Sequence, residues 1–204
     1  MTFAIPRIAT AMNSSTDARV LQTLGMEGVS LALWERSLPD ELARELDALP
    51  PERLPRMRRR LAVRHVSRAI RQSCEDADAG ACSKQLADVV QELSKLAMGV
   101  FASPMLELRL DVTDGQPCPK WHVDAVSGRL LCTLRGPGTE YGPIGPGGKP
   151  ESIHRMARGA VGVFRGALWP GQELAAIVHR SPPREAGGTR LLVVIDPVDD
   201  AGAC

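Results

Sequence analysis

Four polar residues at alternate positions of one short segment have the types and spacing of a reactive site. The string CPKWHVD contains Cys118, Lys120, His122 and Asp124. If residues 118–124 form a strand, these four side chains lie on one face of it. Burying such groups without partners costs roughly 2–7 kcal/mol per group, a cost that a bound metal removes. With the distant His179, His122 and Asp124 predict a centre of two histidines and one carboxylate, which leaves three positions of an octahedral ion open.

Arg190 follows His179 with ten residues between them. A strand ending near His179, a turn over residues 181–188 and a strand beginning at Arg190 would form a hairpin whose two polar side chains face one pocket. A guanidinium group offers a planar fork for a carboxylate. Such an arginine is how the far end of a dicarboxylic 2-oxo acid that chelates the metal would be held.

Other interpretations of the same residues are open at this stage. His122 and Asp124 would form a hydrogen-bonded pair in a metal-free protein, with Arg190 in a surface ion pair. Cys118 is either a small buried apolar residue or a further ligand, and a thiolate ligand would favour zinc over a catalytic iron.

Apolar periodicity and turn residues define the elements that must position this site. Composition changes near Ser103, from Leu, Ala, Arg and Glu before it to Gly, Pro, Val and Thr after it. Apolar residues at helical spacing predict helices over 38–49, 52–74 and 83–101, the second of them rich in arginine and solvated on one face. Short apolar runs separated by turns predict strands over 105–112, 118–124, 129–134, 160–164, 175–178 and 190–195. The Gly- and Pro-rich segment 136–150 is expected to be a long loop.

Composition excludes several classes of protein. The 204 residues contain 25 Lys and Arg against 24 Asp and Glu, and aromatic residues make up only 3%, so we expect no nucleic-acid partner. The sequence shows no signal-peptide pattern and no apolar run of about 18 residues, which favours a cytoplasmic protein without a membrane partner. Five widely spaced cysteines without a CxxC pair favour reduced thiols.

The order HxD, distal histidine, then arginine resembles the Fe(II)/2-oxoglutarate-dependent oxygenases of the double-stranded β-helix fold, over residues 105–197. The resemblance implies that His122, Asp124 and His179 hold iron and that Arg190 binds the distal carboxylate of 2-oxoglutarate. Where some oxygenases have Ser or Thr two residues after the arginine, this chain has Leu192.

Three further residues complete the expected cofactor site. Thr189 is a substitute for the hydroxyl that Leu192 lacks, the Tyr141 phenol would donate to 2-oxoglutarate, and Lys120 would contact cofactor or substrate.

A narrower resemblance covers most of the chain. The strings CPKWHVD, LLCTLRGPGTEY, FRG, WPG and HRSPP resemble an uncharacterised bacterial family associated with gene neighbourhoods of zinc-homeostasis GTPases. This resemblance implies no defined activity.

The sequence thus predicts an α+β protein in which a mainly helical part, residues 1–102, packs on a C-terminal double-stranded β-helix (jelly-roll, cupin-like), residues 103–204, as one compact unit. The expected function is an Fe(II)- and 2-oxoglutarate-dependent oxygenase acting on a small molecule or a protein. One alternative is a non-catalytic zinc-binding protein of metal homeostasis with Cys118 as a ligand. Another is a cupin-like scaffold that has lost its metal and binds a small carboxylate or a partner protein.

Overall fold

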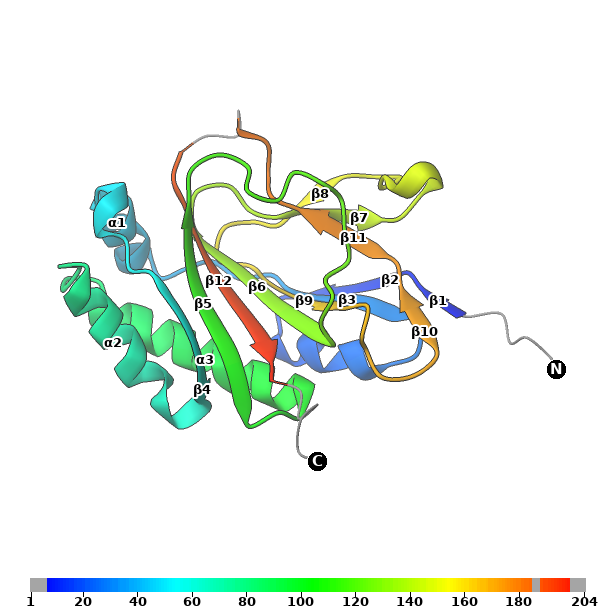
Figure 1. The fold of residues 1–204 in the computed structure, drawn as a ribbon, viewed down its shortest axis with the longest axis horizontal. Helices are drawn as coiled ribbons and strands as arrows, with labels where there is room; N and C mark the ends of the chain where they lie inside the picture. Colours follow the sequence, from blue (N-terminus) through cyan, green and yellow to red (C-terminus); the bar gives the residue numbers. More distant parts are fainter. Residues whose placement is uncertain (1–6, 185–187, 199–204) are drawn as a thin grey trace.

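A large antiparallel sheet is the centre of the computed structural model, which describes residues 7–184 and 188–198 (Figure 1). The two strands at one edge run parallel to each other, and every other neighbouring pair runs antiparallel. In spatial order its seven strands are β2 (Ala11–Ser15), β3 (Val29–Trp34), β9 (Val161–Arg165), β6 (Gly128–Arg135), β12 (Arg190–Pro197), β5 (Met105–Thr113) and β4 (Met57–Ala62).

Two smaller sheets and a layer of helices complete the described part of the molecule. The three-stranded sheet has the order β11 (Ile177–Arg180), β7 (Glu140–Pro143), β8 (His154–Arg155), and β1 (Arg7–Ala9) pairs in parallel with β10 (Glu173–Ala175). The α-helices are α1 (Asp40–Ala48), α2 (Val66–Asp76) and α3 (Ser83–Phe101). Short 3-10 helices are η1 (Ala18–Gly25), η2 (Pro51–Arg53), η3 (Val63–His65) and η4 (Pro146–Gly148). No helix in these ranges is long and apolar enough to cross a membrane.

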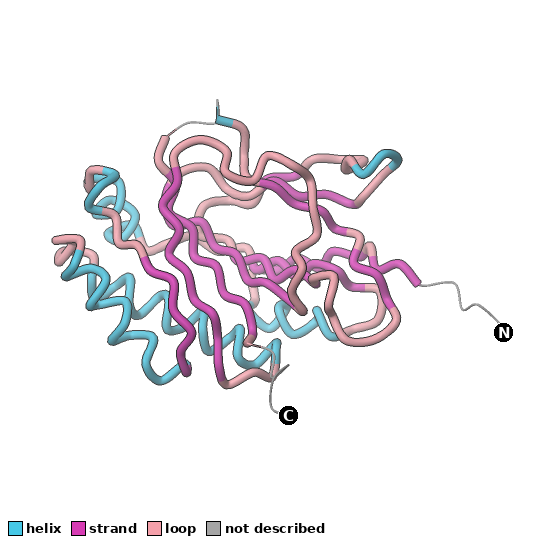
Figure 2. The backbone as a smooth tube through the Cα atoms, in the orientation of Figure 1, coloured by secondary structure: helices cyan, strands magenta, loops and turns pink. Residues whose placement is uncertain are grey.

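The helices and the three-stranded sheet cover opposite faces of the large sheet (Figure 2). Alternate residues of β12, Leu191, Val193 and Ile195, belong to the core shared with the helices. Val194, between them, belongs to a second core shared with the three-stranded sheet. This alternation is the period of two expected of a strand that is buried on both faces.

The second core joins the three-stranded sheet to only part of the large sheet. It contains side chains from β3, β9, β6 and β12, among them Leu31, Phe164 and Leu131, packed against Tyr141 of β7 and Ile177 of β11. It contains no residue of β4 or β5. The face of β4 and β5 that points away from the helices, here called the inner face, is therefore not covered by this core.

The predicted arginine-rich helix over 52–74 is wrong in its first half. Residues 57–62 form strand β4, which pairs with β5 along its whole length, and α2 begins only at Val66. The spacing of Leu54, Met57 and Leu61 is helical, but pairing with β5 overrides it. Because β2, β3 and β4 all belong to the large sheet, the boundary at 102–103 does not separate a helical layer from a sheet.

The expected loop over 136–150 contains the central strand of the three-stranded sheet. Strand β7 pairs with β11 on one side and β8 on the other. Gly142 makes this possible, since a Cβ there would lie 1.9 Å from the carbonyl oxygen of Ser152. The glycine that suggested a loop is thus required by close backbone packing.

Candidate metal centre

The loop over residues 114–127, between β5 and β6, carries two of the three predicted ligands. His122 forms an isolated antiparallel bridge with His179 of β11, through backbone N–O distances of 3.1 and 3.0 Å. The Ser181 amide also donates to the Cys118 carbonyl at 3.0 Å. The expected strand over 118–124 is wrong, because Pro117 and Pro119 cannot donate to a ladder and only one bridge forms.

The other end of this loop is fixed by the segment that follows β9. The amides of Gly166, Ala167 and Leu168 donate to the carbonyls of Ser127, Asp124 and Val126 at 2.9, 2.8 and 3.0 Å. A Cβ on Gly166 would lie 1.8 Å from the Val126 carbonyl oxygen. The Ala167 amide therefore holds the backbone of Asp124, and Gly166 allows the close approach that this bond needs, a role that the sequence pattern alone did not indicate.

Gly166→Ala is expected to destabilise the protein by about 1–3 kcal/mol, the usual cost of overpacking, and to weaken metal binding by displacing Asp124. Thermal unfolding and a metal titration measure the two effects. Gly99→Ala is the matched control, because Gly99 lies in α3 with no atom near its missing Cβ, and alanine there stabilises a helix by up to about 1 kcal/mol. Equal unfolding temperatures and metal affinities in the two variants would contradict this role of Gly166.

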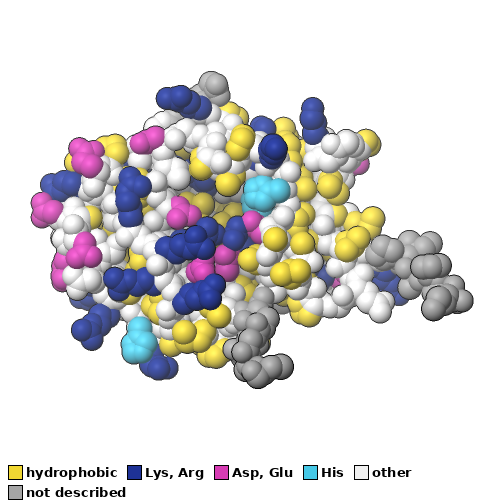
Figure 3. Space-filling view, in the orientation of Figure 1, with side chains coloured by type: hydrophobic (Ala, Val, Ile, Leu, Met, Phe, Trp, Pro, Cys, Tyr) yellow, Lys and Arg dark blue, Asp and Glu magenta, His cyan; other side chains and the backbone are white. Residues whose placement is uncertain are grey.

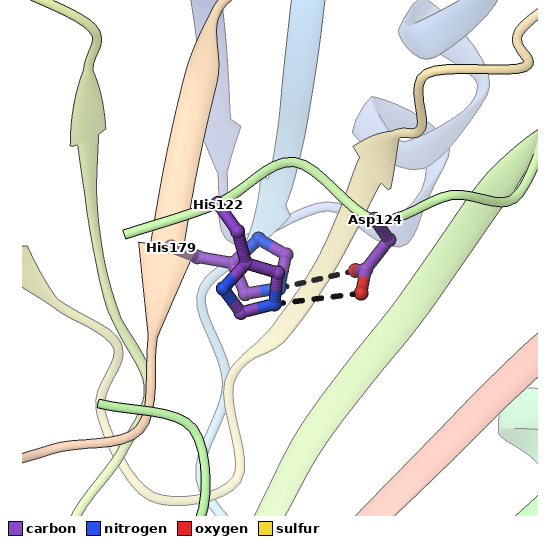
Figure 4. A group of neighbouring side chains, drawn as sticks. All are labelled: His122, Asp124 and His179. Carbon is purple, nitrogen blue, oxygen red and sulfur yellow. Dashed lines mark ion pairs between the residues drawn. The ribbon is translucent and has the colours of Figure 1, made fainter. Parts of the chain in front are cut away.

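His122, Asp124 and His179 converge with their ligand atoms within 4.8 Å of one another (Figure 4). Nε2 of His122 lies 3.6 Å from Oδ1 of Asp124, and Nε2 of His179 lies 3.1 Å from Oδ2. The first distance is too long for a hydrogen bond, and the buried Oδ2 atom has no hydrogen-bond partner in the described residues. The geometry thus differs from the hydrogen-bonded His122–Asp124 pair that was the metal-free alternative.

The tautomer of His122 suits a metal ligand. Its Nδ1 atom lies 2.8 Å from the Lys120 carbonyl oxygen, which can only accept, so Nδ1 carries the hydrogen. The lone pair of a neutral ring is then on Nε2 and faces the carboxylate of Asp124. A ring N–H held by a backbone carbonyl is typical of metal-ligating histidines, because it leaves Nε2 to bind the metal.

Arg129 of β6 is a site residue that the sequence analysis missed. Its Nη1 atom donates to Oδ1 of Asp124, while Nε and Nη2 donate to the two oxygens of Asp196, each at 2.7 Å. Arg129 therefore occupies one oxygen of Asp124 and leaves Oδ2 as the free ligand atom. The available signal was its place five residues after Asp124, but only the sheet register shows that it faces the site.

The protonation of the three residues follows from burial and contacts. Burial favours the neutral form of Asp124, but polar contacts with His122 and His179 and the charge of Arg129 outweigh it and hold its pKa well below the usual range. Contact with Asp124 raises the pKa of His122. Burial lowers the pKa of His179, which favours a neutral ring. The site thus offers an ionised carboxylate and a neutral buried imidazole, both of which metals require.

A cavity of about 160 Å³ extends from the two histidines to Arg190. The Arg190 side chain is 4% exposed, and its Nη2 atom donates to the hydroxyls of Thr133 and Thr139 at 3.1 and 2.6 Å. Its Nε atom has no partner, and Arg190 forms no ion pair with any described residue. Burial lowers its pKa to about 10. The surface ion pair considered from the sequence is therefore wrong, and Arg190 is a buried cation without an ion-pair partner among the described residues. The charge of Asp111, in the wall of the same cavity, attracts it from a longer distance.

Arg190 and His179 reach this cavity by a different route from the predicted hairpin. Strand β11 pairs with β7, whereas β12 pairs with β5 and β6, so the two strands belong to different sheets. The connection crosses from one sheet to the other, and both side chains still face the space between them.

The other predicted site residues lie outside the three-residue group. Cys118 lies in the cavity wall. Lys120 is exposed, and the hydroxyl of Thr189 donates to Asp114. Tyr141 stacks on His154 at 5.5 Å and borders a separate surface groove. Lys120, Thr189 and Tyr141 are not among the residues that line the cavity.

Two facing sheets with a two-histidine, one-carboxylate group between them define a double-stranded β-helix protein with a candidate metal centre. Solved structures share this fold. The rice dioxygenase for auxin oxidation is 14% identical, with a TM-score of 0.57 over 93% of this chain and 83% of that chain. The Arabidopsis thaliana dioxygenase for auxin oxidation 1, solved in a binary complex with 2-oxoglutarate, is 12% identical, with a TM-score of 0.51 over 93% and 92%. The predicted fold class is confirmed.

The chain belongs to the family described as Protein of unknown function (DUF1826), whose model matches residues 15–196. This agrees with the resemblance to an uncharacterised family. No curated protein matches the sequence.

Proposed function

We propose that this protein is an Fe(II)- and 2-oxoglutarate-dependent dioxygenase. The observation that carries the proposal is the buried Arg190, which forms no ion pair with the described carboxylates and lines the same cavity as His122 and His179. A buried guanidinium without a counterion is costly unless a ligand supplies the missing charge. A dicarboxylate that also binds a metal satisfies both ends of this cavity.

His122 Nε2, Asp124 Oδ2 and one ring nitrogen of His179 would hold the iron, and the free Oδ2 atom supports this assignment. Arg190 would bind the far carboxylate of 2-oxoglutarate, with the hydroxyls of Thr133 and Thr139 orienting its guanidinium. Bound Fe(II) with 2-oxoglutarate and O2 would supply the oxidising chemistry that hydroxylates a C–H bond.

Apolar side chains form part of the cavity wall. Leu131, Leu192 and Val194 line it together with the histidines and Arg190. They limit the access of water and strengthen the attraction between Arg190 and a carboxylate, because charges interact more strongly in a medium of lower dielectric constant.

The position of Cys118 favours the oxygenase over a structural zinc site. Cys118 is exposed in the cavity wall and is not part of the three-residue group. A structural zinc site needs four closed ligands, whereas three ligands with open positions suit a catalytic metal.

Anaerobic titration with Fe(II), with and without 2-oxoglutarate, tests the proposal. We expect one equivalent of iron to bind and a weak visible charge-transfer band to appear only when 2-oxoglutarate is added. Slow release of succinate after admission of air is the second readout. Stoichiometric zinc in the purified protein, with no spectral or binding response to 2-oxoglutarate, would refute it.

A further inference from the structure

A band of charged residues crosses the inner face of the large sheet beside the cavity. The register places Arg60 of β4 opposite Glu107 of β5, and Glu107 opposite Asp196 of β12. Arg58 and Arg109 form the next row. Because Met57 and Leu61 face the helices, the alternation of β4 directs Arg58 and Arg60 to the opposite face.

These residues line a groove of about 360 Å³ that adjoins the metal site. Arg109 and Arg129 line both the groove and the cavity, so the two spaces are neighbours. Figure 3 shows basic side chains gathered around acidic ones in the middle of this face, next to a histidine. The groove is lined by four arginines, Arg58, Arg60, Arg109 and Arg129, and by two carboxylates, Glu107 and Asp196. Arg129 also bonds Asp124, and Arg109 lies 3.7 Å from Asp111, so what the groove offers an anion is unpaired guanidinium donors and not a net charge.

Several guanidinium donors of the groove are free. Glu107 accepts from Nε and Nη2 of Arg58 at 3.0 and 2.7 Å and from Nε of Arg60 at 3.0 Å. Nη1 of Arg58 and both amino groups of Arg60 make no hydrogen bond with the described residues, and both side chains are 70% exposed. One carboxylate thus holds two arginines side by side with donors to spare.

Arg109 is the third donor and is only loosely paired. Its nearest carboxylate oxygens, on Asp111 and Asp196, lie 3.7 and 3.5 Å away. Its buried Nε atom has no partner within the described ranges. An unsatisfied buried N–H destabilises the native state, and an oxyanion that accepted from it would offset this cost.

We propose that this groove binds an anionic group, a carboxylate or a phosphate, of the primary substrate. The inference rests on the proposed function in one respect, the reaction of the bound substrate at the metal centre. With the anion held by Arg58, Arg60 and Arg109, the adjoining part of the substrate reaches that centre. The substrate class is then an organic acid or phosphate ester. This anion site is distinct from the one at Arg190, because Arg190 does not line the groove.

Binding of inorganic phosphate to the metal-free protein, followed by ³¹P NMR at constant ionic strength, tests the site without any enzymatic activity. Acetate labelled with ¹³C, followed in the same way, shows whether a carboxylate is preferred. Arg58→Gln with Arg60→Gln is expected to weaken binding of the preferred anion at least tenfold. Glu107→Gln is expected to strengthen it severalfold, because it releases both arginines. Exposed ion pairs contribute little to stability, so these variants should fold.

Arg64→Gln with Arg68→Gln is the matched control. It removes the same charge from two exposed arginines beside and within α2 and is expected to leave anion binding unchanged. Arg190→Met is expected to bind the anion in the groove but not 2-oxoglutarate. The double variant of Arg58 and Arg60 is expected to bind 2-oxoglutarate but not the anion in the groove. Equal loss in the control, or no binding of either anion to the wild type, would overturn the groove proposal. Failure of 2-oxoglutarate binding alone would overturn the proposed function instead.

Discussion

Arg190→Met is expected to abolish the stabilisation of the protein by 2-oxoglutarate while leaving the ligand-free protein at least as stable as the wild type. A ligand that binds only the native state stabilises it by about 2.7 kcal/mol at a concentration of 100 times its Kd. The wild type should show this gain in the presence of a saturating divalent metal, and the variant should not. The measurement is denaturant unfolding of both proteins, with and without 2-oxoglutarate.

Removing the buried Arg190 is expected not to destabilise the ligand-free protein. Arg190 is 4% exposed, no carboxylate is paired with it in the described residues, and burial lowers its pKa to about 10. The native state therefore bears the desolvation cost of this charge without a compensating ion pair. Methionine has similar length, is flexible and removes that cost, although Thr133 and Thr139 each lose a hydrogen-bond donor.

Arg165 provides the matched control, since it is also buried but fully paired. It is 3% exposed, donates to the carbonyls of Leu24 and Met26 and forms an ion pair with Glu173 at 2.6 Å. Arg165→Met is expected to cost about 3–5 kcal/mol with or without 2-oxoglutarate, as is usual when one partner of a buried pair is removed. If Arg190→Met were destabilised to the same extent without ligand, Arg190 would be a structural residue.

Much of the fold was predictable because its elements carry their own periodicity. Strands β5, β6, β9 and β12 and helices α1 and α3 lie within a few residues of the predicted ranges. Strand β4 was not predictable, because its helical apolar spacing conflicts with a pairing that only β5 provides. Strand β7 was missed for the opposite reason, since Gly142 answers to a contact with Ser152 that local sequence does not contain.

The candidate site also contains residues that the sequence predicts and residues that it does not. His122, Asp124, His179 and Arg190 were found from residue type and spacing, and the structure brings them to one cavity or its edge. Arg129 was missed, because its role depends on the register of β6 with β12, which places it beside Asp196.

Gly166 was missed for a related reason. Its role depends on the loop that packs against it, and nothing in the string FRG indicates that contact. A residue that positions a metal-binding side chain of a different element leaves no local pattern in the sequence.

Losing an outer partner of a metal ligand typically weakens metal binding about 10–100-fold. Asp124→Asn is expected to weaken it by more than this, because it removes the charge of a proposed direct ligand. Cys118→Ser is expected to leave the affinity unchanged. Competition with a chelator of known affinity measures both variants. Asp124→Asn should still fold, since Arg129 keeps its two bonds to Asp196.

The pair of variants separates two kinds of metal centre. If the metal is held by His122, Asp124 and His179, substituting Co(II) gives a spectrum without a thiolate charge-transfer band, and Cys118→Ser does not change it. If Cys118 is a fourth ligand, the band is present in the wild type and is lost in Cys118→Ser together with metal affinity. That second result would require Cys118 to move from its exposed position in the cavity wall into the three-residue group, and it would favour a zinc-binding protein over the dioxygenase.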